Sequence, residues 1–97
     1  MSKNYRTSCD DVQDLVNEKG ITPIPTEDWQ EGKTYLTLGL DVQCYPCLTR
    51  TTYLGVEGNK FLFKSEGVEF VTCDEVLYEN TVANRLALYD ACKRVRE

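Results

Sequence analysis

The fold is decided by residues 35–72, YLTLGLDVQCYPCLTRTTYLGVEGNKFLFKSEGVEFVT. Short turns divide this stretch into four runs rich in β-branched and aromatic residues, a composition typical of strands. The predicted strands are residues 35–40, 48–56, 60–64 and 68–72. In the first, Leu36, Leu38 and Leu40 alternate with other residues, which predicts one buried face. Because tight turns join the later runs, we expect an antiparallel meander and not βαβ units.

A first helix is predicted before the sheet, over residues 8–19. Val12, Leu15 and Val16 have the spacing of an apolar stripe on one side of a helix. Gly20 follows directly and is a common helix stop.

A second helix is predicted near the C-terminus, from a cap at Thr81 to about residue 95. Its apolar face is expected to consist of Val82, Leu86, Tyr89 and Cys92. Residues 74–79 fit either a helical lead-in or a strand extension. The predicted fold is therefore α+β, a single domain over residues 1–97. It has a small antiparallel sheet of about four strands, a meander or a partly open barrel, with an N-terminal and a C-terminal helix.

The composition excludes several classes of function. The 97 residues include 16 Asp and Glu against 11 Lys and Arg, a net charge of −5, and no histidine. Serine–histidine, cysteine–histidine and HExxH catalysis are therefore excluded. The acidic balance argues against direct nucleic-acid binding and against an anionic membrane surface, because both require clustered Lys and Arg. No catalytic motif is found, so we expect no enzyme, no catalytic residues and no cofactor.

The five cysteines raise the questions of compartment and of metal binding. No signal peptide or membrane-spanning stretch is recognised, so we expect a cytoplasmic protein with reduced thiols. Cys44 and Cys47 have the C-x-x-C spacing of zinc and thiol-redox sites. Zinc would need further ligands from the isolated Cys9, Cys73 and Cys92 or from a carboxylate, and redox catalysis would need a helix after the motif. No metal site is predicted, and a structural zinc or thiol-redox protein using this pair stays an alternative.

Most of the excess negative charge lies in the first third of the chain, where residues 1–31 carry a net charge of −4. On the predicted helix, Asp10, Asp14 and Glu18 recur at every fourth residue opposite the apolar stripe, with Asp11 beside them. After a proline-containing connector, Thr26 is expected to cap one further turn that carries a second acidic group. The candidate partner-binding residues are Asp10, Asp11, Asp14, Glu18, Glu27, Asp28 and Glu31.

The spacing of the helical carboxylates is close to that of one nucleic-acid strand. Eight residues of helix rise about 12 Å, a length over which one strand places about three to four phosphates. A protein with such a row of charges can occupy a Lys- and Arg-lined groove that a partner uses for DNA. We therefore expect a basic protein surface of a nucleic-acid-binding complex as the partner.

The segments SCDDVQDLVNEKG (residues 8–20) and TEDWQEG (residues 26–32) belong to an acidic chain of under 100 residues with no catalytic motif. In this overall pattern the chain resembles the small inhibitors that phages carry against host defences. It is similar in size and charge to DNA-mimicking anti-CRISPR proteins. The resemblance transfers no family residue to a numbered position. It implies a phage protein that competes with target DNA for a basic channel in a CRISPR surveillance complex.

The favoured hypothesis is a non-enzymatic inhibitor that acts as a DNA mimic through its acidic face. Trp29 and Tyr45 are candidate aromatic anchors for such an interface. The alternative from another class is a small SH3-like structural or adaptor module of a phage or bacterial assembly. It would bind through strand edges and through the aromatic residues Tyr53, Phe61, Phe63, Phe70 and Tyr78.

Overall fold

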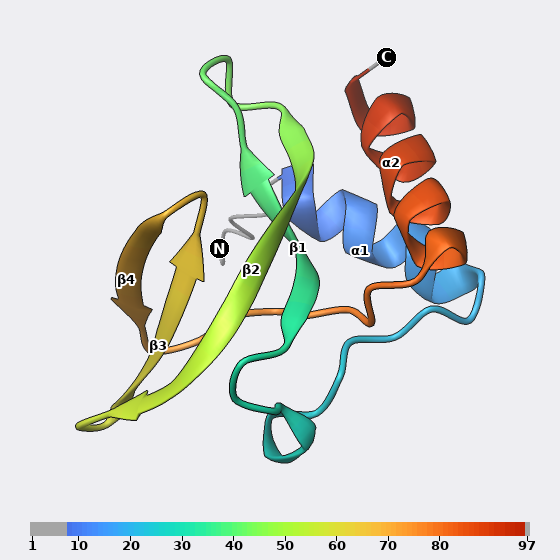
Figure 1. The fold of residues 1–97 in the computed structure, drawn as a ribbon. Coiled ribbons are helices and arrows are strands. Elements are labelled where there is room, and N and C mark those ends of the chain that lie inside the picture. The colour runs from blue at the N-terminus through green and yellow to red at the C-terminus, as the bar shows by residue number, and fades with distance from the viewer. Residues whose placement is uncertain (1–7, 97) are drawn as a thin grey trace, which may run out of the picture.

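The computed structural model describes residues 8–96, and Figure 1 shows their arrangement. The elements in chain order are α1 (Ser8–Glu18), a 3-10 helix η1 (Thr26–Asp28), β1 (Thr34–Leu40), β2 (Pro46–Glu57), β3 (Lys60–Ser65), β4 (Val68–Thr72) and α2 (Val82–Arg96). The predicted α+β class, with a helix at each end of the chain, is confirmed. Among residues 8–96, no helix has the length and apolar character needed to cross a bilayer.

The sheet is an antiparallel meander. Its four strands lie in chain order, each paired antiparallel with the next, and the sheet is not closed into a barrel. The turn between β3 and β4 has positive φ at both Glu66 (52°) and Gly67 (81°). Positive φ at both central residues is the pattern of type I′ hairpins, whose twist matches that of the strands they join. Local turn chemistry therefore fixes the register of this hairpin.

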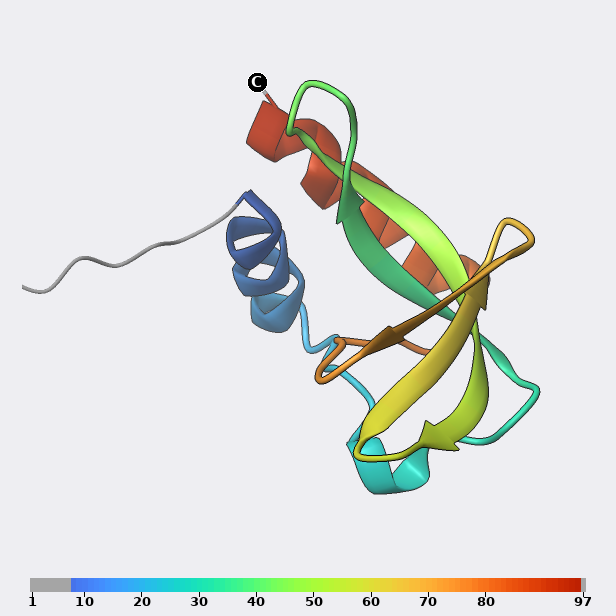
Figure 2. The same ribbon diagram turned by 90° about the vertical axis from the view of Figure 1, so that its left-hand side faces the viewer.

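Strand β2 is bent where its pairing with β3 slips by one residue. Tyr53 pairs with Phe63 and Gly55 pairs with Leu62, so that Leu54 has no opposite residue in β3. Gly55 has φ of +129°, a conformation that favours glycine. Because a bulge bends a strand and increases its twist, the first half of β2 stays beside α2 while β3 and β4 turn away from it (Figures 1 and 2).

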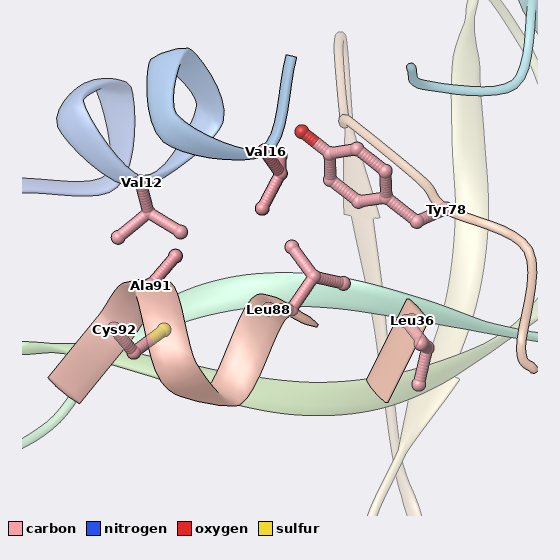
Figure 3. Packing of buried hydrophobic residues seen from close by; sticks show 7 residues of the cluster. All are labelled: Val12, Val16, Leu36, Tyr78, Leu88, Ala91 and Cys92. Carbon is pink, nitrogen blue, oxygen red and sulfur yellow. The ribbon is translucent and has the colours of Figure 1, made fainter. Parts of the chain in front are cut away.

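Two apolar clusters lie on either side of β1. The first, drawn in Figure 3, consists of Val12, Val16, Leu36, Tyr78, Leu88, Ala91 and Cys92. The second consists of Tyr35, Tyr53, Phe63 and Leu77. The helices cover one side of β1, and the aromatic residues of the bent sheet fill the other.

This arrangement corrects the prediction that the first strand buries only one face. Tyr35, Leu36 and Thr37 are consecutive and all are buried, whereas Leu40 is 51% exposed. The middle of β1 is enclosed on both sides because the helices and the bent sheet pack against opposite faces of it. Its end extends beyond both clusters, so the expected apolar alternation does not continue there.

Residues 74–79, whose sequence fits either a helical lead-in or a strand extension, form neither. Among them, Tyr78 makes an isolated antiparallel bridge to Leu36 of β1. Leu77 points into the second cluster and Tyr78 into the first. The connector to α2 is thereby attached to the edge of β1 that β2 does not occupy.

The apolar face predicted for α2 is wrong in three of its four members. Val82, Leu86 and Tyr89 are 61%, 66% and 64% exposed, and Cys92 alone of the predicted set is buried. The side that packs against the core carries Leu88 and Ala91 instead. The helix itself begins as predicted, because the backbone N–H of Asn84 donates to the Thr81 Oγ1 at 3.1 Å, a standard N-cap contact.

Candidate functional site

The acidic residues of α1 lie on a helix whose other side is anchored in the core. Val12 and Val16 are fully buried and pack in one cluster with Leu88 and Ala91 of α2 (Figure 3). Because residues opposite the buried stripe of a helix face outward, the acidic positions are carried at the surface. Asp11, Asp14 and Glu18 are exposed and Asp10 is half-buried. The predicted acidic face of this helix is therefore present in the fold.

Lys19, the basic residue directly after α1, contacts α2. The Nζ of Lys19 forms an ion pair with Asp90 of α2 at 3.6 Å, and both side chains are about half-exposed. Asp90 also pairs with Arg94 of the same helix at 3.1 Å. The contact from Lys19 joins the end of α1 to α2, although exposed pairs of this kind contribute at most about 1 kcal/mol to stability.

The second acidic group lies on a different part of the surface. Glu27, Asp28 and Glu31 are exposed, and both views place η1 apart from α1, with the extended segment 20–25 between them (Figures 1 and 2). The Glu31 carboxylate lies against β2, since a Cβ built on Gly55 would be 3.3 Å from its Cδ and Oε2. The seven predicted acidic residues therefore form two patches and not one continuous face.

Trp29 is a structural residue of the sheet cluster. Its ring makes edge-on contacts with Tyr53, Phe61 and Phe63 at centroid distances of 5.4, 4.9 and 5.6 Å, and its indole N–H donates to the Ile24 carbonyl at 3.2 Å. Its role as an interface anchor is therefore not supported by its position. Tyr45 is 40% exposed.

The aromatic set of the adaptor alternative lies largely in the core. Tyr53, Phe63 and Tyr78 are buried, and Phe61 is half-buried. Phe70 alone of that set is exposed, at 37%, and it stacks on Phe63 at a centroid distance of 5.8 Å. The prediction that these aromatic residues present a binding surface is wrong for the buried members. Tyr53 and Phe63 pack in the cluster that the bent sheet encloses, and Tyr78 packs in the cluster beneath the two helices.

The cysteines gather in a combination that the sequence spacing did not predict. Cys9 donates its thiol to the Gly39 carbonyl at a sulfur–oxygen distance of 3.6 Å, and a Cβ on Gly39 would lie 4.0 Å from the Cys47 Sγ. Burial chiefly, and then the neighbouring Cys47, raises the pKa of Cys9. Burial chiefly, and then Cys9 and Cys47, raises the pKa of Cys92 to about 11. Cys9 and Cys92 therefore remain thiols near neutral pH.

The C-x-x-C pair is divided between two environments. Cys44 is exposed in the turn between β1 and β2 with φ of 64°, whereas Cys47 is half-buried in β2 near Cys9. Among residues 8–96, no group of three or more Cys, Asp and Glu side chains is arranged to hold a metal ion. The fold that brings Cys9, Cys47 and Cys92 together left no signal in the sequence, because each comes from a different element.

One further feature was missed by the sequence. Between the start of β2 and α2 lies a hollow of about 530 Å³ with apolar and cationic side chains. Its location depends on which side of α2 faces the core, and that side was not predicted from the sequence.

Comparison with known proteins found no matching family model, no matching curated protein and no matching solved structure.

Proposed function

We propose that this chain is a non-enzymatic, cytoplasmic inhibitor that uses the acidic side of α1 to occupy a basic, nucleic-acid-binding surface of a partner protein. The observation that carries the proposal is the burial of Val12 and Val16 beneath exposed carboxylates on the same helix. Anchoring of the apolar side fixes where the carboxylates lie, so less conformational entropy is lost when a partner binds them.

The charges of α1 suit a groove built for one nucleic-acid strand. From Asp11 to Glu18 the helix rises about 10 Å, over which one strand presents about three phosphates. Carboxylates at similar spacing can form charge-assisted hydrogen bonds with the Lys and Arg side chains of such a groove. The partner class that the resemblance of residues 8–20 and 26–32 implies is a CRISPR surveillance complex.

The two acidic patches have separate roles in this proposal. The α1 patch is the primary contact because it follows a single straight element. The η1 patch, with Glu27 and Asp28, reaches a second site on the partner or adds long-range attraction. Electrostatic attraction of this kind accelerates association more than it lowers the dissociation rate.

The experiment measures binding of target DNA by guide-loaded CRISPR surveillance complexes in the presence of the purified chain. We expect competition with DNA that weakens as salt rises from about 0.05 to about 0.5 M, because the screening length falls across this range. The Asp14→Lys/Glu18→Lys double variant is expected to associate at least about tenfold more slowly than the wild-type chain.

The matched control is Glu57→Lys/Glu69→Lys, which changes the net charge equally at exposed positions of the sheet. It is expected to retain most of the competition. An absence of competition, or equal losses in both double variants, would show that the face of α1 is not the binding surface. Binding that does not respond to salt would favour the adaptor alternative. A Glu27→Lys/Asp28→Lys variant measures how much the η1 patch contributes to the competition with DNA.

A further inference from the structure

The exposed side of α2 is apolar and basic, unlike the rest of this acidic protein. Val82, Leu86 and Tyr89 follow one another at helical spacing and are exposed. Arg85, Lys93 and Arg96 are exposed on the same side of the helix, by the same spacing. No acidic residue of α2 falls within this stripe, because Asp90 lies on the flank where it pairs with Lys19 and Arg94.

This side of α2 borders the hollow next to β2. Its apolar lining comes from Pro46, Cys47 and Leu48 of β2 and from Cys92 and Tyr89 of α2. A volume of about 530 Å³ falls within the range of about 300–1,000 Å³ typical of ligand sites. Pro46 and Cys92 are buried, so the hollow extends inward to the core.

A second hollow of about 360 Å³ meets the first at Leu48 and is also lined by Leu36 of β1 and by Glu66 of the turn between β3 and β4. Both include Leu48 in their lining, and the second extends to Arg50 of β2 and Arg85 of α2. The two hollows adjoin at Leu48, beside β2 and α2, which pack side by side (Figure 1). We call the two adjoining hollows together the α2–β2 groove.

The α2–β2 groove is positively charged in a chain whose net charge is −5. Its lining includes Arg50, Arg85, Lys93 and Arg96, against the single acid Glu66. Within residues 8–96, Arg96 pairs with Asp41 at 3.9 Å and lies over the Tyr45 ring at 5.5 Å. The other three cations make no ion pair in that described part of the chain.

We propose that the α2–β2 groove binds a short acidic segment of a partner protein. A large apolar side chain of that segment fills the hollow beside Tyr89, and its carboxylates pair with Lys93 and Arg85. Charge complementarity identifies the occupant as anionic, and the apolar lining of the larger hollow requires an apolar group as well.

A peptide fits these features better than a nucleic-acid strand. A phosphate backbone offers no apolar group for the hollow at Cys92, and strands are usually held by several stacked aromatic residues, whereas Tyr89 is the one aromatic side chain in the groove lining. The net negative charge of the chain also repels a long polyanion beyond the groove. This site is separate from the acidic face of α1 and has the opposite charge.

The test is a selection from a random linear peptide library, displayed on yeast, against the immobilised full chain. Enriched peptides are synthesised, and their affinities are measured by fluorescence anisotropy. We expect enriched sequences with several Asp or Glu residues around a large apolar residue. The Arg85→Glu/Lys93→Glu variant is expected to weaken their binding by about tenfold or more, and Tyr89→Ser is also expected to weaken it.

The control variants change the net charge or an exposed apolar side chain at positions outside the lining of the α2–β2 groove. Lys60→Glu/Lys64→Glu alters the net charge equally on β3, and Val56→Ser removes an apolar side chain that is 64% exposed, as Tyr89 is. Both are expected to bind as the wild-type chain does, as is Asp14→Lys/Glu18→Lys, which separates this site from the α1 face. Thermal unfolding verifies that each variant is folded.

Three results would overturn the proposal. The first is that no peptide is enriched over the support alone. The second is that enriched peptides lack acidic residues or bind the Arg85→Glu/Lys93→Glu variant as tightly as the wild-type chain. The third is that a mixed-sequence single-stranded DNA oligonucleotide binds the groove more tightly than any selected peptide, which would make nucleic acid the occupant.

Discussion

Leu36 and Tyr78 exchange two backbone hydrogen bonds: the Leu36 N–H donates to the Tyr78 carbonyl at 2.9 Å, and the Tyr78 N–H donates to the Leu36 carbonyl at 2.8 Å. This bridge joins the connector before α2 to the middle of β1. It places the Tyr78 ring against α1, where its hydroxyl points toward Val16 (Figure 3). The start of α2, four residues later, is positioned by this attachment.

The Tyr78 hydroxyl costs stability because it is buried without a hydrogen-bond partner in residues 8–96. An unpaired buried polar group of this kind costs about 1–3 kcal/mol. We therefore expect Tyr78→Phe to leave the free energy of unfolding at neutral pH unchanged or higher by about 1 kcal/mol. Urea denaturation of both proteins at neutral pH measures the difference. A clear loss of stability would show that the hydroxyl has a partner.

The same residue makes stability depend on pH in alkali. Burial raises the pKa of Tyr78 to about 12, above a value of about 10 in the unfolded chain. The folded state holds the hydroxyl proton more tightly than the unfolded chain does. The free energy of unfolding therefore keeps its full value below about pH 10 and falls as the pH rises towards 12. The loss is about 2–3 kcal/mol. Tyr78→Phe should remove this loss of stability in alkali, whereas Tyr45→Phe, at an exposed ring, should lose stability as the wild-type chain does. If the free energy of unfolding fell equally with pH in all three proteins, the assignment to Tyr78 would be wrong.

The two leucines of α2 provide a direct test of which side of the helix faces the core. Leu88 is fully buried and Leu86 is 66% exposed. Leu88→Ala is expected to lower the free energy of unfolding by about 2–5 kcal/mol, and Leu86→Ala by no more than about 0.5 kcal/mol. Chemical denaturation compares the two. If Leu86→Ala were the more damaging variant, the orientation of α2 would be reversed from the one described.

Gly55 is required at the bulge of β2 for its backbone conformation. Its φ is +129°, and an added Cβ would lie 3.3 Å from the Glu31 carboxylate. We expect Gly55→Ala to destabilise the chain by about 1–3 kcal/mol. Gly39→Ala is the control, because its Cβ would meet Thr49 Cγ2 at an ordinary 3.6 Å. In a Glu31→Ala background the penalty at Gly55 should largely persist, since backbone strain and not side-chain contact is its main source.

The thiols should differ in reactivity according to burial. Cys44 and Cys73 are exposed, whereas burial raises the pKa of Cys92 to about 11. The thiolate is the reactive form, so at about pH 8 little of Cys92 is reactive compared with a free thiol of pKa about 8.5. Iodoacetamide labelling followed by mass spectrometry should modify Cys44 and Cys73 first and Cys92 last. Rapid modification of Cys92 in the folded chain would contradict its burial between α2 and the core.

The strands and α1 show which features of the fold local sequence patterns predict and which they do not. The bounds of β4 and the turn at residues 66–67 agree with the sequence, because each depends on neighbouring residues alone. The acidic side of α1 was also predictable, since the apolar stripe that includes Val12 and Val16 is the one suited to face the core. The burial of Tyr35 next to Leu36 was not predictable, because it depends on a sheet that bends at Gly55 and covers β1 from the other side.

The sequence by itself determined the element order, the hairpin turns and the presence of two acidic groups near the N-terminus. Tertiary structure decided which stripe of α2 is buried, how the acidic groups are separated, and where the basic α2–β2 groove lies. The helix carries two apolar stripes, one with Leu88 and Ala91 and one with Val82 and Leu86, and hydrophobicity cannot choose between them. The choice follows from contacts between distant segments, the Leu36–Tyr78 bridge and the packing of Val12 and Val16 against α2, which no local repeat of the sequence encodes.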